Sequence, residues 1–261
     1  MTGPTERFAA LVRRPDGEIP LDEAALLIAA HAHPELDVAA ELARLDEVAA
    51  GCTEATLDGL RRHLFDELGF TGNRRRYGDP HNSFLNDVVS RRVGIPISLS
   101  VLSMEVGRRV GVPLVGIGLP GHFLVRHDGG AGEVLDPFGG GTVLDRAGCE
   151  ALFQAVHGPG AALPDQLPVS GRRAILARML ANLRQLYLAA GDAPSAGWVY
   201  RLRAAIPPAA PSDHVEVARA LASLGRFTEA AETLEALADL VDDAGADQAR
   251  ARAGSLRALL N

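Results

Sequence analysis

The segment from Gly94 to Gly111 constrains the fold of this chain more than any other. Gly94 interrupts the preceding helical pattern, and Pro96 is well tolerated at the first position of a new helix. The helix expected from Pro96 to about Val110 is apolar on most of its sides, and Gly111 suits its end. Because a helix that is apolar all round has to be buried, other elements must cover it on several sides.

Helical periodicity also precedes this segment. Apolar residues recur at helical spacing over about residues 21–31, 37–49, 56–68 and 82–92. Gly69 suits the end of the third helix, and Asn82 suits the N-cap of the fourth. The sequence therefore predicts an N-terminal helical layer.

Three short extended runs follow the apolar helix, over residues 115–119, 121–127 and 133–135. The glycine-rich loop from Asp128 to Gly132 predicts a hairpin in which facing residue numbers sum to about 258–260. His122 then lies opposite roughly residues 136–138. A histidine and an aspartate on adjacent strands form the oriented imidazole pair that nucleophilic sites use. We therefore expect His122 and Asp136 to lie together.

The C-terminal part repeats itself after a segment rich in Gly, Pro and Ala, residues 158–171. The 34-residue period relates one set of four residues to another: Leu183, Tyr187, Gly191 and Ala196 to Val217, Leu221, Gly225 and Ala230. This period is typical of tetratricopeptide (TPR) helical hairpins. Two such units are too few for a free-standing array, so we expect them to pack on the preceding domain. The two glycines are expected to permit close approach of the helices.

Four motifs carry a family resemblance: Tyr77-x-Asp79-Pro80-x-Asn82-Ser83-Phe84-Leu85-Asn86, Arg91-Arg92-x-Gly94-Ile95-Pro96-Ile97-Ser98-Leu99-Ser100, Gly118-Leu119-Pro120-Gly121-His122-Phe123-Leu124-Val125-Arg126 and Asp136-Pro137-Phe138-x-Gly140-Gly141. Together they resemble the SirB-type bacterial family, which joins a transglutaminase-like N-terminal region to C-terminal TPRs. The resemblance covers about residues 20–240.

The resemblance implies an α+β fold with a papain- or transglutaminase-like core, in which helices pack on a small antiparallel sheet. The expected organisation is a transglutaminase-like domain over residues 1–157, a linker over residues 158–171 and a TPR-like helical region over residues 172–261.

The resemblance also places a proline where such enzymes carry their nucleophile. Gly94-Ile95-Pro96 stands where Gly-x-Cys is expected, whereas His122 and Asp136 match the second and third members of the triad. Proline cannot supply a thiolate. Cys52 and Cys149 are far apart in the chain and have no metal-type spacing.

Ser100 is the tentative substitute for the missing nucleophile in a degraded triad with His122 and Asp136. It lies one turn deeper in the helix than Pro96, on the same face. The alternative interpretation is that Pro96, Ser100, Ser103 and Gly107 form a stripe of small residues for close packing, with the serine hydroxyls returned to backbone carbonyls.

Candidate ligand-binding residues are Tyr77, Asn82, Asn86 and Pro96, which would line a cleft near His122. Asn82 and Asn86 are four residues apart, so on one helix both amides can point at one spot. The alternatives are an N-cap role for Asn82 and a structural, hydrogen-bonded role for His122. His31 and His33 are expected on the surface rather than as a metal pair, and we expect neither a metal nor a cofactor.

Three functions remain open at this stage. The first is a non-catalytic adaptor or regulator, a pseudoenzyme that binds a protein partner through its TPR-like region. The second is a hydrolase or acyltransferase in which His122 and Asp136 activate water or Ser100. The third is a protein that binds a small molecule or cofactor in the His122 cleft. The formal charge of −7 argues against nucleic acid as a partner, and the absence of a long apolar run or signal peptide favours a cytoplasmic protein without membrane contact.

Overall fold

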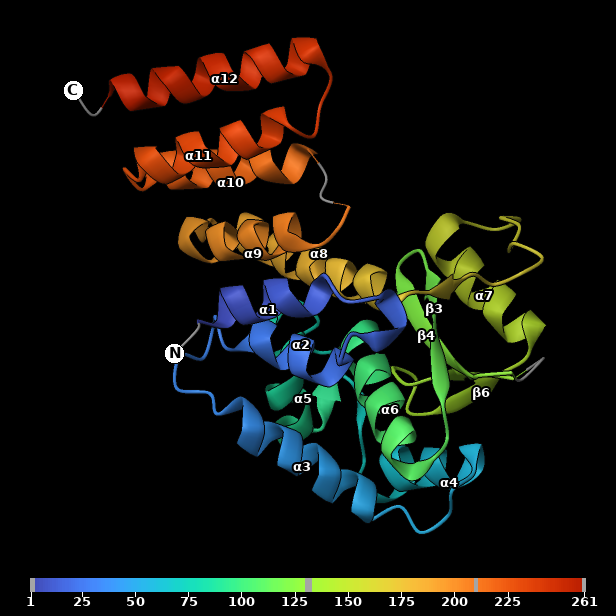
Figure 1. Ribbon diagram of the computed structural model, residues 1–261. Helices are drawn as coiled ribbons and strands as arrows, with labels where there is room; N and C mark the ends of the chain where they lie inside the picture. Colours follow the sequence, from blue (N-terminus) through green and yellow to red (C-terminus); the bar gives the residue numbers. More distant parts are fainter. Residues whose placement is uncertain (1–2, 130–132, 209–210, 260–261) are drawn as a thin grey trace. The chain divides into compact units, whose positions relative to one another are not determined.

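The computed structural model describes residues 3–129, 133–208 and 211–259, and is drawn as a ribbon in Figure 1. It divides into two compact units. One comprises residues 16–179, and the other combines the residues up to Pro15 with those from Leu180 onward. The boundary falls within helix α8 (Arg172–Ala190). These units differ from the expected domains, because the first helix, α1 (Pro4–Val12), groups with the C-terminal helices. The centre of the expected hairpin loop, residues 130–132, lies outside the described residues.

The larger unit contains both helices and strands. Its helical elements are η1 (Asp16–Glu18), α2 (Leu21–Ala29), α3 (Val38–Ala50), α4 (Leu57–Arg61), η2 (Arg62–Glu67), η3 (Pro80–Asn82), α5 (Leu85–Arg91), α6 (Pro96–Val110) and α7 (Arg146–His157). Its strands are β1 (Thr71–Gly72), β2 (Val93–Gly94), β3 (Leu114–Leu119), β4 (His122–His127), β5 (Val134–Asp136), β6 (Thr142–Leu144) and β7 (Val169–Ser170). Strands β1 and β2 form a parallel pair, and the others form an antiparallel sheet in the order β6-β5-β4-β3-β7. This arrangement confirms a mixed α+β fold.

Helix α6 is the centre of the larger unit, as its composition predicts. It begins at Pro96 and ends before Gly111, whose φ of 81° closes the helix. Helices α2, α3 and α5 and strands β3 and β4 pack against it, and Figure 1 shows α6 beside these two strands. Its serines and nearly all of its apolar side chains are buried. The prediction of a buried helix from Pro96 to Val110 is confirmed.

The register of the sheet also agrees with the sequence. Val125 pairs with Leu135 and Arg126 with Val134, so facing residue numbers sum to 260. Residues 158–171, predicted to be a linker, are more than a connection: strand β7 extends the sheet beside β3. Leu163 is buried in an apolar cluster with Leu124 and with Cys149 of α7. The Gly-, Pro- and Ala-rich composition of this segment does not predict this packing.

The segment before α6 departs from its prediction. Residues 82–92 do not form one helix capped by Asn82, because η3 ends at Asn82 and α5 begins only at Leu85. Asp79 caps η3 by accepting a hydrogen bond from the His81 N–H, and Asn82 is fully buried. The N-cap role of Asn82 is therefore wrong, since its side chain is used for tertiary contacts instead.

A charge cluster with two buried carboxyl groups joins α2 to the end of α6. The Asp22 carboxylate lies 2.7 Å from the Arg109 guanidinium and 3.1 Å from that of Arg108, and Glu105 lies 2.9 Å from Arg108. Burial opposes ionisation of Asp22, but the hydrogen bond from Arg109, the N–H of Glu23 and the two arginine charges lower its pKa below the ordinary 3.8. Burial and the nearby Asp22 charge raise the pKa of Glu105 above the ordinary 4.5.

The two carboxyl groups should give opposite pH dependences of stability. Asp22 stabilises the fold above its unfolded pKa, and this stabilisation is lost as the pH falls below 3.8. Glu105 favours the fold in its protonated form, and that contribution is lost as the pH rises above 4.5. Denaturant unfolding from about pH 3 to pH 7 should show that Asp22→Asn reduces the loss of stability on the acid side. Glu105→Gln should instead reduce the loss of stability as the pH rises above 4.5. Unchanged slopes in both variants would contradict the assignment.

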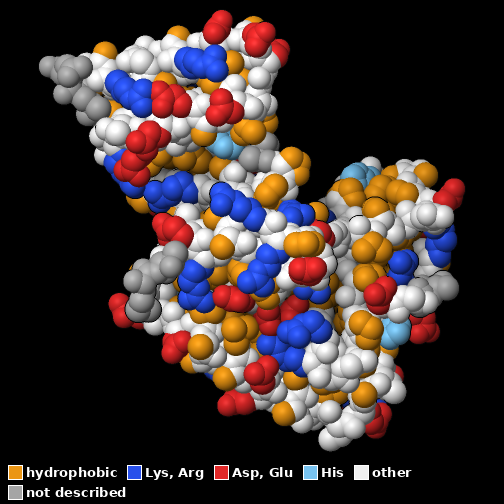
Figure 2. Space-filling view, viewed as in Figure 1, with side chains coloured by type: hydrophobic (Ala, Val, Ile, Leu, Met, Phe, Trp, Pro, Cys, Tyr) orange, Lys and Arg blue, Asp and Glu red, His pale blue; other side chains and the backbone are white. Residues whose placement is uncertain are grey.

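The smaller unit is helical. Besides α1 and the end of α8, it contains α9 (Ala193–Ala205), α10 (Pro211–Ser223), α11 (Phe227–Ala238) and α12 (Asp243–Ala258). The 34-residue repeat appears in the structure as buried positions on successive helices: Leu183, Tyr187 and Ala196, then Val217, Leu221 and Ala230. The two repeat glycines lie between helices. On the face visible in Figure 2, acidic and basic side chains are interspersed over these helices. Within the described ranges, the structure has no helix both long and apolar enough to cross a bilayer.

The expected reason for the repeat glycines is wrong. A Cβ atom at Gly191 or Gly225 would meet nothing within 4 Å, so neither glycine serves close helix packing. Both are instead in the left-handed region, with φ of 69° and 72°, and end α8 and α10. Gly191→Ala should therefore destabilise the chain by about 1–2 kcal/mol through backbone strain. Gly191→Asn should cost less because asparagine tolerates this conformation. Equal losses in thermal unfolding would contradict a backbone cause.

Candidate functional site

His122 and Asp136 form a side-chain pair at one end of the antiparallel sheet. His122 begins β4, after a tight turn at Gly121 with φ of 71°, and Asp136 ends β5. The Nε2 atom of His122 lies 2.8 Å from Oδ1 of Asp136. The side chains are 12% and 8% exposed, respectively. The hairpin register thus brings together the two residues that the sequence places together.

The turn after Asp136 holds its carboxylate in place. The Phe138 N–H donates to Oδ1 of Asp136 over 3.0 Å, and the Gly141 N–H donates to the Asp136 carbonyl over 2.9 Å. A Cβ atom at Gly139 would come within 2.7 Å of Oδ2, so the backbone closes tightly over the carboxylate. Since Oδ1 is an acceptor, His122 donates from Nε2, and in a neutral imidazole this leaves the lone pair on Nδ1. An imidazole oriented in this way can act as a base or as an acceptor for a ligand.

The Phe138 ring packs against the imidazole and in turn contacts Tyr77 and Arg74. The Phe138 ring lies edge-on to His122, with 5.9 Å between ring centroids, and edge-on to Tyr77, with 5.8 Å. The Arg74 guanidinium lies 4.9 Å from the Phe138 centroid. Burial raises the pKa of Tyr77, although the Arg178 charge opposes this. The phenol therefore stays neutral and able to donate a hydrogen bond.

The start of α6 neighbours this group through β1 and β2. Gly72 of β1 pairs with Gly94 of β2, two residues before Pro96. The Gly72 N–H donates to the Phe138 carbonyl over 3.1 Å, and a Cβ atom at Gly72 would strike the Phe138 ring at 2.4 Å. Phe138 therefore bridges the segment that leads into Pro96 and the ring of His122.

The serines of α6 are committed to the fold. Ser100 is fully buried and donates to the Phe123 carbonyl over 3.3 Å, and Ser103 donates to the Leu99 carbonyl over 2.9 Å. Ser98 faces elsewhere and donates to the Asn82 carbonyl over 2.5 Å. Ser100 thus ties α6 to β4 beside His122. This geometry favours the packing interpretation over a nucleophilic role for Ser100.

The two asparagines do not converge as expected. The Asn82 amide donates to the Arg76 and Tyr77 carbonyls, and its oxygen accepts from the Asn73 side chain. The Asn86 amide instead donates to Asp87 over 3.2 Å. Their amides have different targets because Asn82 precedes the helix that carries Asn86. Asn82 shapes the loop that presents Tyr77, so its contribution to a ligand site is indirect.

Sequence reasoning did not identify Arg178 as part of this region. Its guanidinium donates to the carbonyls of Leu119 over 2.6 Å and His122 over 2.7 Å, and lies 5.2 Å from the Phe123 ring centroid. Burial lowers its pKa, with the Tyr77 phenol acting in the opposite sense. Arg178 closes the β3–β4 turn from a position far along the chain in α8. No local pattern in the sequence indicates this contact.

Comparisons with known proteins identify the family to which the chain belongs. Residues 30–181 match the profile of the family described as the Transglutaminase-like superfamily. A UPF0162 protein of Xylella fastidiosa is 40% identical over 189 residues, 66% of each chain, and UPF0162 protein PA3419 of Pseudomonas aeruginosa is 37% identical over 183 residues, again 66% of each. F-box only protein 21 of Homo sapiens is 37% identical over 144 residues, 50% of this chain and 21% of that protein.

The match therefore spans just under two thirds of the UPF0162 relatives. No solved structure matches. The family match covers more than half of the chain, including α6, the sheet and the His122–Asp136 pair. The chain belongs to the transglutaminase-like superfamily.

Proposed function

We propose that this protein is a non-catalytic binding protein, an adaptor or regulator built on a transglutaminase-like domain that lacks its nucleophile. The observation that carries the proposal is the start of α6. Its first residue is Pro96, and the hydroxyl on the same face one turn later, on Ser100, is buried and bonded to the Phe123 carbonyl. Neither Pro96 nor Ser100 therefore offers a free nucleophile near the start of α6.

The two cysteines do not replace the missing nucleophile. Burial raises the pKa of the Cys149 thiol, which is fully buried in an apolar cluster. A buried thiol with a raised pKa is a poor nucleophile. The Cys52 thiol lies in the turn after α3 and donates to the Glu54 carbonyl over 3.4 Å. Neither residue belongs to the motifs around His122.

A ligand bound beside His122 would meet a mixed surface. Tyr77 offers a neutral phenol and is half-exposed, Arg74 offers a positive charge, and His122 offers the Nδ1 lone pair. Such a set suits a small polar or anionic molecule, or a peptide carboxylate. This is the third function considered from the sequence, and it is compatible with an adaptor.

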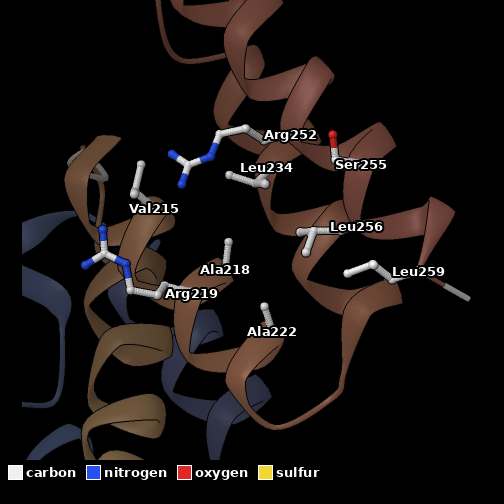
Figure 3. Close-up of a pocket in the computed structure, with 9 residues that line it drawn as sticks. All are labelled: Val215, Ala218, Arg219, Ala222, Leu234, Arg252, Ser255, Leu256 and Leu259. Atoms are coloured by element: carbon white, nitrogen blue, oxygen red, sulfur yellow. The ribbon is translucent and has the colours of Figure 1, made fainter.

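The C-terminal helices supply a second binding surface, which we propose to be TPR-like. A groove of about 380 Å³ lies between α10, α11 and α12. Figure 3 shows the side chains that line it. Its apolar floor includes Ala218, Ala222 and Leu256, and Arg219 and Arg252 stand beside it. An apolar segment with acidic flanks fits this combination, because it would bury its apolar side chains and pair with the arginines.

The alternative is a hydrolase in which His122 activates water. The hydrogen bond between His122 and Asp136 favours it, because it orients the imidazole. One assay separates the two functions: purified protein is offered a glutamine peptide with an amine, and separately activated esters. A binding protein should give no turnover above that of His122→Ala. Turnover that His122→Ala abolishes would establish an enzyme.

Partner binding in the groove between α10, α11 and α12 can be tested with a pair of variants. Ala222→Glu places a charge on the floor of the groove, whereas Ser223→Glu places one next to it on an exposed position of α10. Protein partners recovered with the unmodified chain should be lost with Ala222→Glu and kept with Ser223→Glu. The NMR signals of His122 should be unchanged in both. Partners retained by Ala222→Glu would contradict binding through the groove.

A further inference from the structure

Three side chains from separate elements meet at a second place in the larger unit. His33 lies in the turn between α2 and α3, His81 in η3, and Asp87 in α5. His33 Nε2 lies 3.0 Å from Oδ2 of Asp87, and His81 Nδ1 lies 2.6 Å from the same oxygen. These three atoms all lie within 4.8 Å of one another. His33 is partly exposed, as expected, but its side chain also contacts partners from distant parts of the chain, which the sequence does not indicate.

The surroundings hold the three side chains in this arrangement. The buried Phe84 ring lies edge-on to both imidazoles, with centroid distances of 5.4 Å to His33 and 6.4 Å to His81. The His33 N–H donates to the Ala29 carbonyl over 3.0 Å, which fixes the turn. An apolar wall behind polar ligands raises the strength of their electrostatic interactions.

Asn86 supports the carboxylate from the other side. Its Nδ2 donates to Oδ1 of Asp87 over 3.2 Å, which leaves Oδ2 directed at the two imidazoles. The Asn86 residue is 9% exposed, and its Oδ1 has no hydrogen-bond partner among the residues that the structure describes. A supporting amide of this kind is typical of metal sites, where outer groups orient the ligating carboxylate.

We propose that His33, His81 and Asp87 bind a divalent transition-metal ion of the Zn²⁺ class. Two imidazole nitrogens and one carboxylate oxygen are donors that Zn²⁺ accepts, whereas Mg²⁺ and Ca²⁺ prefer oxygen alone. Zinc–ligand distances of about 2.0–2.2 Å place the donors of a tetrahedron roughly 3.4 Å apart. The two nitrogen–oxygen distances, 3.0 and 2.6 Å, are shorter than this spacing, and all three atoms lie within 4.8 Å of one another. Binding an ion therefore requires the imidazoles to move away from Oδ2 by less than about 1 Å. The His81 side chain is 54% exposed, which leaves room for water as a fourth ligand.

This site is separate from the proposed binding function, and its test does not depend on that function. Full-length protein without an affinity tag, stripped with a chelator, is titrated with ZnCl₂ in a calorimeter. We expect one equivalent to bind, and His33→Ala, His81→Ala and Asp87→Asn each to weaken binding at least tenfold. His157→Ala, an exposed histidine of α7, is the matched control and should bind as the unmodified chain does.

Two further measurements distinguish metal ligation from a purely structural role of the histidines and from binding at the cysteines. His81→Gln can still donate a hydrogen bond to Asp87 but lacks the imidazole, so loss of binding in this variant shows that the nitrogen is a ligand rather than a structural donor. Co²⁺ should give the visible bands of a tetrahedral nitrogen and oxygen site without a thiolate band, which excludes Cys52 and Cys149. Binding that survives His81→Ala and His33→Ala, or no binding at micromolar Zn²⁺, would overturn the proposal.

Discussion

Replacing Pro96 by cysteine is expected to create a thiol whose pKa falls to about 7.5 or lower, from the ordinary value near 8.5. The first turn of α6 presents unpaired backbone N–H groups, which stabilise a thiolate. We expect His122 to lie near this turn, because Ser100 bonds to the Phe123 carbonyl and Phe138 contacts both His122 and the segment before Pro96. Pro96 is buried, and burial alone would raise the pKa of a thiol. A lowered pKa therefore requires the helix and the imidazolium together.

The measurement is a pH titration of thiolate absorbance in a Cys52→Ser background, where the remaining Cys149 is buried and its thiol pKa is raised. Pro4→Cys is the matched control, since Pro4 occupies the same position at the start of α1 and is exposed. Adding His122→Ala to Pro96→Cys should raise the thiol pKa again. If the pKa is the same with and without His122, the two positions do not form the layout of a thiol enzyme.

The central part of the fold could be predicted because its determinants are local. Gly94, Pro96 and Gly111 bound α6, and the apolar surface between them requires burial. The hairpin fixes the β4–β5 register, which brings His122 diagonally across from Asp136, and the turn after Asp136 positions its carboxylate. In each case a few neighbouring residues determine the geometry, so one sequence suffices.

The predictions failed where contacts between residues far apart in the sequence determine the structure. Asn82 has the residue type of a helix cap, but its side chain pairs with Asn73 and its carbonyl with Ser98. Residues 158–171 have the composition of a linker, yet Val169 and Ser170 extend the sheet. Arg178 reaches the β3–β4 turn from α8. Periodicity and composition do not encode such contacts, because both are properties of neighbouring residues.

The proposed metal site, with His33 and His81, also depends on contacts that the sequence does not reveal. His33 and His81 are 48 positions apart in the sequence and have no recognisable ligand spacing. Their imidazoles share Oδ2 of Asp87 only because the turn after α2 packs against η3 and α5. A site assembled from three elements becomes visible only once the packing is known.

Gly141→Ala is expected to cause a large loss of stability and to disturb the Asp136 turn. Gly141 has φ of 78°, and a Cβ atom there would lie 2.3 Å from the Phe65 ring. The left-handed conformation costs a non-glycine residue about 1–2 kcal/mol. Overpacking against a buried ring adds about 1–3 kcal/mol. Because the Gly141 N–H bonds to the Asp136 carbonyl, relief of the clash should also move Asp136.

Gly69→Ala separates the two causes, because Gly69 has a similar φ of 74° but a Cβ atom there would meet nothing within 4 Å. Both variants lose the conformational freedom of glycine, and only Gly141→Ala meets a ring. Denaturant unfolding should therefore show Gly141→Ala destabilised by about 1–3 kcal/mol more than Gly69→Ala. The NMR signals of His122 should shift in Gly141→Ala alone. The hydrogen bond between His122 and Asp136 depends on the turn after Asp136, and only Gly141→Ala disturbs that turn. Equal stabilities, or an unshifted His122 in a destabilised Gly141→Ala, would show that the turn does not hold the His122–Asp136 pair.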